Sequence, residues 1–201
     1  EWGDDVKRLP GWLRAAGLAL GILGTPDPEP KDPISAKVFA EEVDLVFRAY
    51  PQGIIGTFLL ALPLACVLWN HVAKGALLVW VVAMAGFGFA RFHGARTYLR
   101  AQPAPEQIPR WARRLRWIAL YLGACWGLGL FLLPPGIRDF PGMFYVLCLF
   151  GAGSGAIHSF AILPGLYRAF FLPLFLSLMV WALLTLDGNA WAAAALLFLA
   201  G

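Results

Sequence analysis

Residues 53–69, GIIGTFLLALPLACVLW, run for seventeen positions without a charged side chain. An α-helix of that length rises about 25 Å, and the hydrocarbon core of a bilayer is about 30 Å thick. The apolar residues do not alternate with polar ones, as they would in a strand of a membrane barrel. The stretch therefore predicts a helix that crosses a membrane.

Five further apolar runs follow this one. They cover residues 72–90, 117–133, 141–163, 169–186 and the segment from 191 onward. The 201 residues are 60% hydrophobic and 14% charged, whereas a soluble domain is about 45–50% apolar and about 25% charged. This composition excludes a soluble globular domain, a disordered chain and a disulfide-stapled secreted module. We expect an all-α polytopic membrane protein with a six-helix transmembrane bundle.

Basic residues are distributed unequally between the two sides of the predicted bundle. Of the 16 lysines and arginines, fourteen fall on one side and two, Lys74 and Arg138, on the other. The arginines are densest between Arg91 and Arg116, in the predicted loop between the second and third spans. Loops rich in Lys and Arg stay in the cytoplasm, so we expect both termini there. No nucleic-acid recognition motif accompanies this charge, which favours the lipid bilayer as partner.

The predicted domain organisation has three parts. Residues 1–33 hold a short apolar segment, expected to lie in the membrane interface, and a proline-rich linker. Residues 34–50 form a predicted amphipathic pre-membrane helix, with Asp32 as N-cap and Pro33 in the first turn. Residues 51–201 form the six-span domain. Its last span has only eleven residues, so we expect it to be truncated here and to continue toward a cytoplasmic domain.

Cysteine and histidine residues are few and widely separated. They are Cys66, Cys125, Cys148, His71, His93 and His158. The cysteines lie inside apolar runs without metal-ligand spacing, so we expect free thiols. The first and last of the histidines differ in depth by about 20 Å, too far to share a ligand. We therefore expect neither a metal site nor a cofactor.

A serine and a histidine share the fourth predicted span with several glycines. The run Gly151–Gly155 with Ser154 resembles the Gly-x-Ser-Gly motif of intramembrane serine proteases, but Ala152 replaces its first glycine and the sixth run has no histidine. His158 is one helical turn from Ser154, which does not aim the imidazole at the hydroxyl. We therefore expect no catalytic site. Close helix packing is favoured instead, on small-xxx-small faces. These faces comprise Gly123, Gly127, Gly151 and Gly155.

Aromatic side chains surround the histidine of the fourth span. An ionisable residue inside a bilayer usually faces the helix bundle, and aromatic walls with few polar groups suit a small amphipathic ligand. We therefore predict a ligand pocket among the third to fifth spans. Its lining would comprise Trp126, Phe144, Phe150, Ser154, His158 and Phe171.

Several short motifs follow one another in a characteristic order. They are EEVDLVFRAYPQGIIG (41–56), RWARRLRW (110–117), GACWGLGLFLLPPG (123–136), FGAGSGAIHSFAILPGLYRAFFLPLFL (150–176) and LDGN (186–189). Their order and spacing resemble the six-span N-terminal sensory region of bacterial GGDEF/EAL cyclic di-GMP signalling proteins and of membrane sensor histidine kinases. The resemblance covers the chain from residue 34 to its end.

The resemblance implies an input module in the bacterial inner membrane that controls a cytoplasmic output domain. A cyclic di-GMP cyclase or phosphodiesterase is the favoured output, with a histidine kinase as the other, and either implies a homodimer formed through the output domain. No catalytic residue of these enzymes can be carried over to this sequence. Two alternatives from other classes remain: a small-solute transporter or channel, and a structural subunit of a membrane complex.

Overall fold

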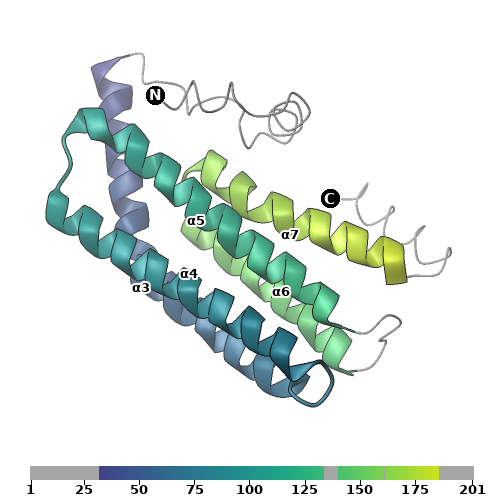
Figure 1. Ribbon diagram of the computed structural model, residues 1–201. Coiled ribbons are helices and arrows are strands. Elements are labelled where there is room, and N and C mark those ends of the chain that lie inside the picture. Colours follow the sequence, from purple (N-terminus) through teal and green to yellow (C-terminus); the bar gives the residue numbers. More distant parts are fainter. Residues whose placement is uncertain (1–31, 134–139, 161, 186–201) are drawn as a thin grey trace, which may run out of the picture.

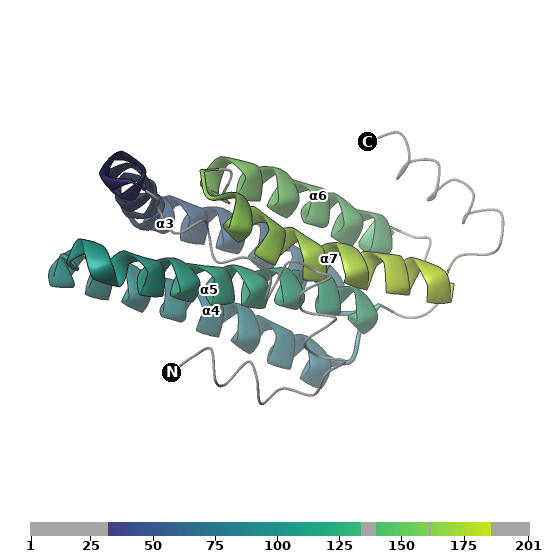
Figure 2. The same ribbon diagram turned by 90° about the horizontal axis from the view of Figure 1, so that it is seen from above.

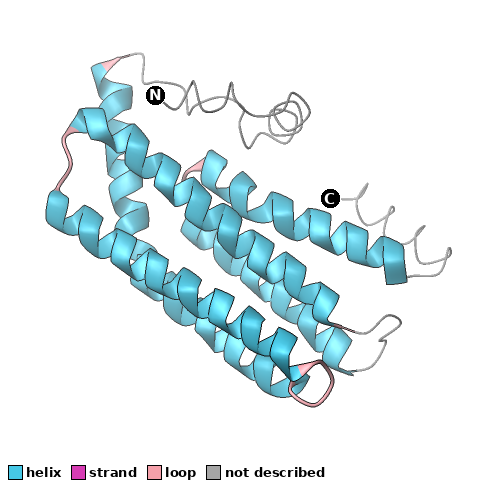
Figure 3. Cartoon of the chain, viewed as in Figure 1, coloured by secondary structure: helices cyan, strands magenta, loops and turns pink. Residues whose placement is uncertain are grey.

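The computed structural model describes residues 32–133, 140–160 and 162–185, and this part of the chain is helical without any strand (Figure 3). The elements are α3 (Pro33–Leu68), α4 (Lys74–Ala101), the short η1 (Pro105–Gln107), α5 (Ile108–Leu128), the short η2 (Gly129–Leu132), α6 (Phe140–Phe160) and α7 (Pro164–Thr185). The predicted all-α class is confirmed for these residues.

Five of the described helical segments are long and apolar enough to cross a membrane. The chain is therefore a multi-pass membrane protein, as its composition predicted. The sixth predicted span, from residue 191, lies outside the described residues. So do residues 1–31 of the predicted interfacial segment and linker, which was predicted over residues 1–33.

Helix α3 begins where the local sequence predicted. Asp32 is the N-cap, Pro33 occupies the first turn, and the backbone amide of Ser35 donates to Asp32 Oδ1 at 2.8 Å. α3 runs without a break for 36 residues, through the predicted boundary between residues 34–50 and the first span. Pro51 lies inside the helix and cannot donate a backbone hydrogen bond. Figure 1 shows α3 bending between its purple first part and the part beside α4.

Helix α4 continues well beyond residue 90, the predicted end of the second span. It ends at Ala101, where Gln102 adopts a left-handed conformation with φ 39° and its amide donates to the carbonyl of Tyr98 at 3.1 Å. The buried residues of α4 recur every three or four positions along its whole length, so the first arginines of the predicted loop are helical. They are Leu77, Trp80, Met84, Phe87, Gly88, Arg91, Ala95 and Tyr98.

The helices form a bundle in which successive long helices run in opposite directions (Figures 1 and 2). α5 packs along α7, α3 packs on both α4 and α6, and α4 also packs on α5. We call the end where α3, α5 and α7 begin the basic end. Its half of the bundle contains Lys37, Arg48, Arg91, Arg96, Arg100, Arg110, Arg113, Arg114, Arg116 and Arg168, whereas Lys74 lies at the opposite end.

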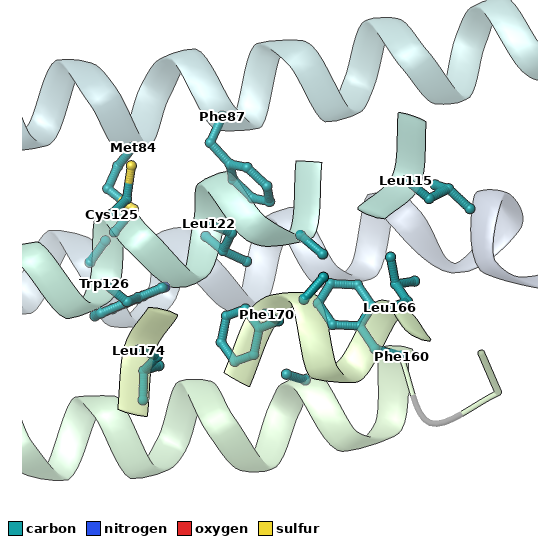
Figure 4. Packing of buried hydrophobic residues seen from close by; sticks show 14 of the residues in the cluster. Met84, Phe87, Leu115, Leu122, Cys125, Trp126, Phe160, Leu166, Phe170 and Leu174 are labelled. Carbon is teal, nitrogen blue, oxygen red and sulfur yellow. The ribbon is translucent and has the colours of Figure 1, made fainter. Parts of the chain in front are cut away.

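Large apolar side chains fill the space between the helices. In Figure 4, Phe87 of α4, Leu122 of α5 and Phe170 of α7 meet in the interior. Other large apolar side chains face outward, including Leu59, 72% exposed, and Phe89, 71% exposed. An apolar exterior of this kind is what contact with lipid tails requires.

Candidate functional site

Arg91 is a charged side chain buried inside the bundle. Only 2% of its surface is exposed, although it lies within one of the candidate membrane spans. It is seventeen residues beyond Lys74, a helical rise of about 25 Å. Arg91 therefore lies in the basic-end half of the span, within reach of the membrane boundary. Ionisable side chains at such depth are costly and commonly functional.

Three aromatic rings and one glycine enclose the Arg91 guanidinium. Its Cζ lies 4.0 Å from the ring centroid of Tyr50, 5.4 Å from that of Phe160 and 5.7 Å from that of Phe87. A Cβ added to Gly53 would lie 2.5 Å from Nη2, so any larger residue there would require the guanidinium to shift. Helices α3, α4 and α6 thus contribute jointly to this site, which we call the Arg91 cage (Tyr50, Gly53, Phe87, Arg91 and Phe160).

Three buried polar atoms of the cage have no hydrogen-bond partner in the described part of the chain. Nε and Nη2 of Arg91 and the hydroxyl of Tyr50 are buried, and none of the three makes a hydrogen bond. A carboxylate lies on the same helix as Tyr50, but Asp44 Oδ2 accepts from Nε of exposed Arg48 at 2.6 Å. Aromatic faces attract a cation but satisfy no N–H donor. The cage therefore holds three buried donor atoms without an acceptor.

An aromatic cluster adjoins the cage toward the basic end. Phe47 of α3 stacks on Tyr98 of α4 with ring centroids 4.0 Å apart, and Trp111 of α5 contacts both rings edge-on at 5.8 and 5.4 Å. Tyr50 contacts Phe47 at 5.5 Å and also the guanidinium. It therefore links the Arg91 cage to three helices at the basic end.

Similarity to known proteins does not assign a function to this arrangement. No protein family, curated protein or solved structure matches the chain. The chemistry of the site is therefore the basis for a functional assignment: a fixed cation and a phenol hydroxyl, both desolvated, can bind a group that carries several acceptor oxygens.

The residues of the predicted ligand pocket differ in their burial. Trp126 is buried and packs edge-on against Trp80 at 5.9 Å, while Phe144 is half-buried. Ser154 is exposed and Phe150 is 67% exposed on the outer face of α6. Phe171 is 37% exposed and stacks on neighbours of its own helix. The side chain of His158 lies outside the described part of the structure.

The two predicted small-residue faces differ in their surroundings. A Cβ on Gly123 would collide with the backbone carbonyl of Phe170, and one on Gly127 would lie 2.6 Å from the Cβ of Ser177. These two glycines thus allow α5 to approach the backbone of α7. Gly151 makes only ordinary contact with Leu60, and the Cβ position of Gly155 meets nothing described within 4 Å.

Two aromatic side chains hold the end of α5 near the opposite end of the bundle. Nε1 of Trp80 donates to the carbonyl of Cys125 at 2.9 Å, and the Tyr145 hydroxyl donates to the carbonyl of Trp126 at 2.8 Å. A Cβ on Gly129, where α5 becomes η2, would lie 2.6 Å from that Nε1. Helices α4 and α6 are thereby fixed to α5 at a depth where hydrogen-bonding water is scarce.

Metal ligation has no support among the described residues. No group of three His, Cys, Asp or Glu side chains there is arranged to hold an ion. The three cysteines are free: Cys66 is exposed, and Cys125 and Cys148 are buried.

The sequence interpretation missed the cage because it assigned Arg91 to a loop. A signal was nevertheless present. Arg91 lies four residues after Phe87 and seven before Tyr98, which continues the spacing of the buried face of α4. An arginine on an apolar stripe of an unbroken helix indicates a buried charge more strongly than a surface loop.

Proposed function

We propose that the chain is the transmembrane input module of a signalling protein in the bacterial inner membrane, and that it controls a cytoplasmic output domain. The favoured output is a cyclic di-GMP cyclase or phosphodiesterase, with a histidine kinase as the other. One observation carries the proposal: the unsatisfied Arg91 cage lies against the bend of α3 and is linked through Tyr50 to the aromatic cluster.

The shape of the bundle supports an output on the side of the basic end. Helix α3 has 36 residues and α4 has 28, and they are about 54 and 42 Å long at 1.5 Å per residue. Both exceed the bilayer core of about 30 Å. At the opposite end, the connection between them has only residues 69–73. Loops rich in Lys and Arg remain cytoplasmic, so the excess helix length would face the cytoplasm.

The proposed mechanism is a shift between two arrangements of α3. A signal alters the balance only if it binds one arrangement more tightly than the other. Occupation of the cage would move Tyr50, and its contact with Phe47 would carry the movement into the aromatic cluster. Pro51 supplies a place where α3 bends at low cost. The part of α3 before Pro51 would then change its position relative to α4 and α5.

The coding sequence beyond Gly201 tests the proposal most directly. We expect a GGDEF, EAL or histidine-kinase domain there. In the full-length protein, Arg91→Met should change the output activity at least threefold, whereas Arg96→Met, at an exposed position of the same helix, should not. Cyclic di-GMP turnover or autophosphorylation in proteoliposomes is the measurement. Lack of any output domain in the same chain or in a co-purifying partner would refute the proposal.

An anion transporter is the second candidate, since buried charges in membrane spans also mark substrate pathways. Reconstitution into liposomes distinguishes it, because a transporter should release a trapped anion such as phosphate and lose that flux with Arg91→Met. If the chain is an input module instead, neither the unaltered protein nor Arg91→Met should release the anion.

A further inference from the structure

We infer that the Arg91 cage is a binding site for the oxyanion headgroup of a membrane amphiphile, supplied from the bilayer leaflet at the basic end. The inference concerns binding alone, and it holds whether or not the chain controls an output domain.

The chemistry of the ligand follows from the donors that face it. Arg91 offers two unsatisfied donor nitrogens, Nε and Nη2, and Tyr50 one hydroxyl oxygen, all buried. A guanidinium forms paired, charge-assisted hydrogen bonds with a phosphate or carboxylate, and these are the strongest hydrogen bonds that proteins make. A phosphate or carboxylate has enough lone pairs for the phenol as well. A cationic or neutral apolar ligand would leave all three donors unsatisfied.

The described part of the chain offers the cage no anion of its own. Its carboxylates all belong to the segments at the basic end: Asp32, Glu41, Glu42, Asp44 and Glu106. Asp44, the nearest of them in sequence to Tyr50, already accepts from Arg48. The acceptor that would neutralise Arg91 must therefore come from outside the described residues.

The depth of the cage favours a lipid over a dissolved ion. Counted from Lys74, Arg91 lies about 25 Å into a core of about 30 Å, close below the headgroups of the leaflet at the basic end. Its neighbours Phe89 and Phe92 are 71% and 53% exposed on the outer face of α4, where acyl chains would lie. A dissolved ion arriving from the basic end would meet the aromatic cluster, which contacts Tyr50 of the cage through Phe47.

Entry from the membrane requires only that α3 move slightly away from α4. Pro51 removes a backbone hydrogen bond from α3 two residues before Gly53, so the helix can yield close to the backbone that closes the cage. A lipid headgroup could then approach Arg91 between the two helices while its chains remain in the bilayer.

The test is ligand-induced stabilisation of the full chain in dodecyl maltoside, a detergent without an anionic group. We expect phosphatidylglycerol to raise the unfolding temperature of the unaltered protein, because a ligand that binds only the folded state stabilises it. Diacylglycerol with the same chains supplies the tails without the anion, and inorganic phosphate supplies the anion without the tails. Neither should reproduce the rise.

Two pairs of variants identify the site. Arg91→Met should weaken the apparent affinity for phosphatidylglycerol at least tenfold, whereas Arg96→Met, an exposed arginine on the same helix, should leave it unchanged. Gly53→Ala should also weaken it, since the added Cβ displaces the guanidinium. Gly56→Ala is the matched control, because a Cβ there meets nothing within 4 Å. The glycine pair keeps the test valid if Arg91→Met fails to fold.

Equal responses of the unaltered protein, Arg91→Met and Gly53→Ala to phosphatidylglycerol would overturn the inference. A rise with inorganic phosphate alone, abolished by Arg91→Met, would uphold the oxyanion site but overturn the lipid as its source. A rise with diacylglycerol that equals the rise with phosphatidylglycerol would overturn it as well, since the tails alone would then account for binding.

Discussion

At the scale of single residues, burial of the Arg91 charge costs free energy, and the contacts of its guanidinium recover only part of that cost. A charged side chain at the centre of a membrane helix costs about 2.5–3.5 kcal/mol on insertion scales, which is an upper bound for Arg91 because it lies nearer the membrane boundary. Desolvated cation–π contacts return about 2 kcal/mol. The rings of Tyr50, Phe87 and Phe160 supply such contacts, yet two guanidinium nitrogens remain unsatisfied. Arg91 therefore destabilises the cage that it defines.

Replacing Arg91 by Met should stabilise the protein in a neutral detergent. Met fills a similar volume and removes the unpaired charge, so we expect the free energy of unfolding in dodecyl maltoside to rise by about 1–2 kcal/mol. Denaturant unfolding followed by circular dichroism measures this change. Arg96→Met, on the exposed side of α4, should stay within about 0.5 kcal/mol of the unaltered protein. A marked loss of stability in Arg91→Met would mean that the guanidinium already has an acceptor.

At the scale of the helices, features that depend on nearby residues were more predictable than features that depend on tertiary packing. The start of α3 was predictable because Asp32, Pro33 and Ser35 interact only with their own first turn. The end of α4 was not, because a series of arginines resembles a solvated loop until its three-and-four spacing is considered. The bend of α3 also has a local cause in Pro51, but local sequence does not reveal that the helix continues beyond it.

The start of α3 should weaken in acid. The hydrogen bond from the Ser35 amide lowers the pKa of Asp32, so its contribution to stability is complete above the unfolded pKa of about 4. That contribution is lost as the pH falls through the lower, folded-state pKa. Hydrogen exchange should therefore show less protection of the first turn at pH 3 than at pH 6. Asp32→Asn keeps a capping side chain that does not titrate, and its protection should not change.

The contact between α5 and α7 at Gly123, which we call the α5–α7 seam, should tolerate no added side chain. A Cβ on Gly123 collides with the backbone carbonyl of Phe170, which cannot rotate away, so Gly123→Ala should cost about 1–3 kcal/mol. Gly155→Ala enters open space on α6 and should stabilise by up to about 1 kcal/mol, because alanine favours a helix more than glycine does. Thermal unfolding in detergent compares the two. Equal losses in both variants would contradict this account of the seam.

The same comparison shows why glycine spacing alone does not identify a packing face. Gly123–Gly127 and Gly151–Gly155 have the same small-xxx-small pattern, yet only the first pair lies against another helix backbone in the described structure. The pattern permits close approach but does not select the neighbour. Which helices meet depends on the whole arrangement, and so does the exposure of Phe150 and Ser154 on α6.

At the scale of the whole molecule, charge and helix length are concentrated at one end. The basic end carries the described arginines, the aromatic cluster and the parts of α3 and α4 that exceed the bilayer core, which we call their extensions. The opposite end has the short connection of residues 69–73. The apolar runs in the sequence predicted the number of passes within the described residues. The unequal distribution of Lys and Arg predicts their direction, which fixes the side on which an output domain would lie.

Labelling of single cysteines tests this direction. In a Cys66→Ser background, which removes the exposed native thiol, His71→Cys lies in the short connection and Glu106→Cys in η1 at the basic end, both at exposed positions. A membrane-impermeant maleimide should label His71→Cys on intact spheroplasts, and Glu106→Cys only after lysis, because loops rich in Lys and Arg stay inside. The reverse pattern would place the extensions of α3 and α4 outside the cell. No cytoplasmic domain could then respond to the aromatic cluster, and the proposed input function would fail while the Arg91 site could still bind a lipid of the outer leaflet.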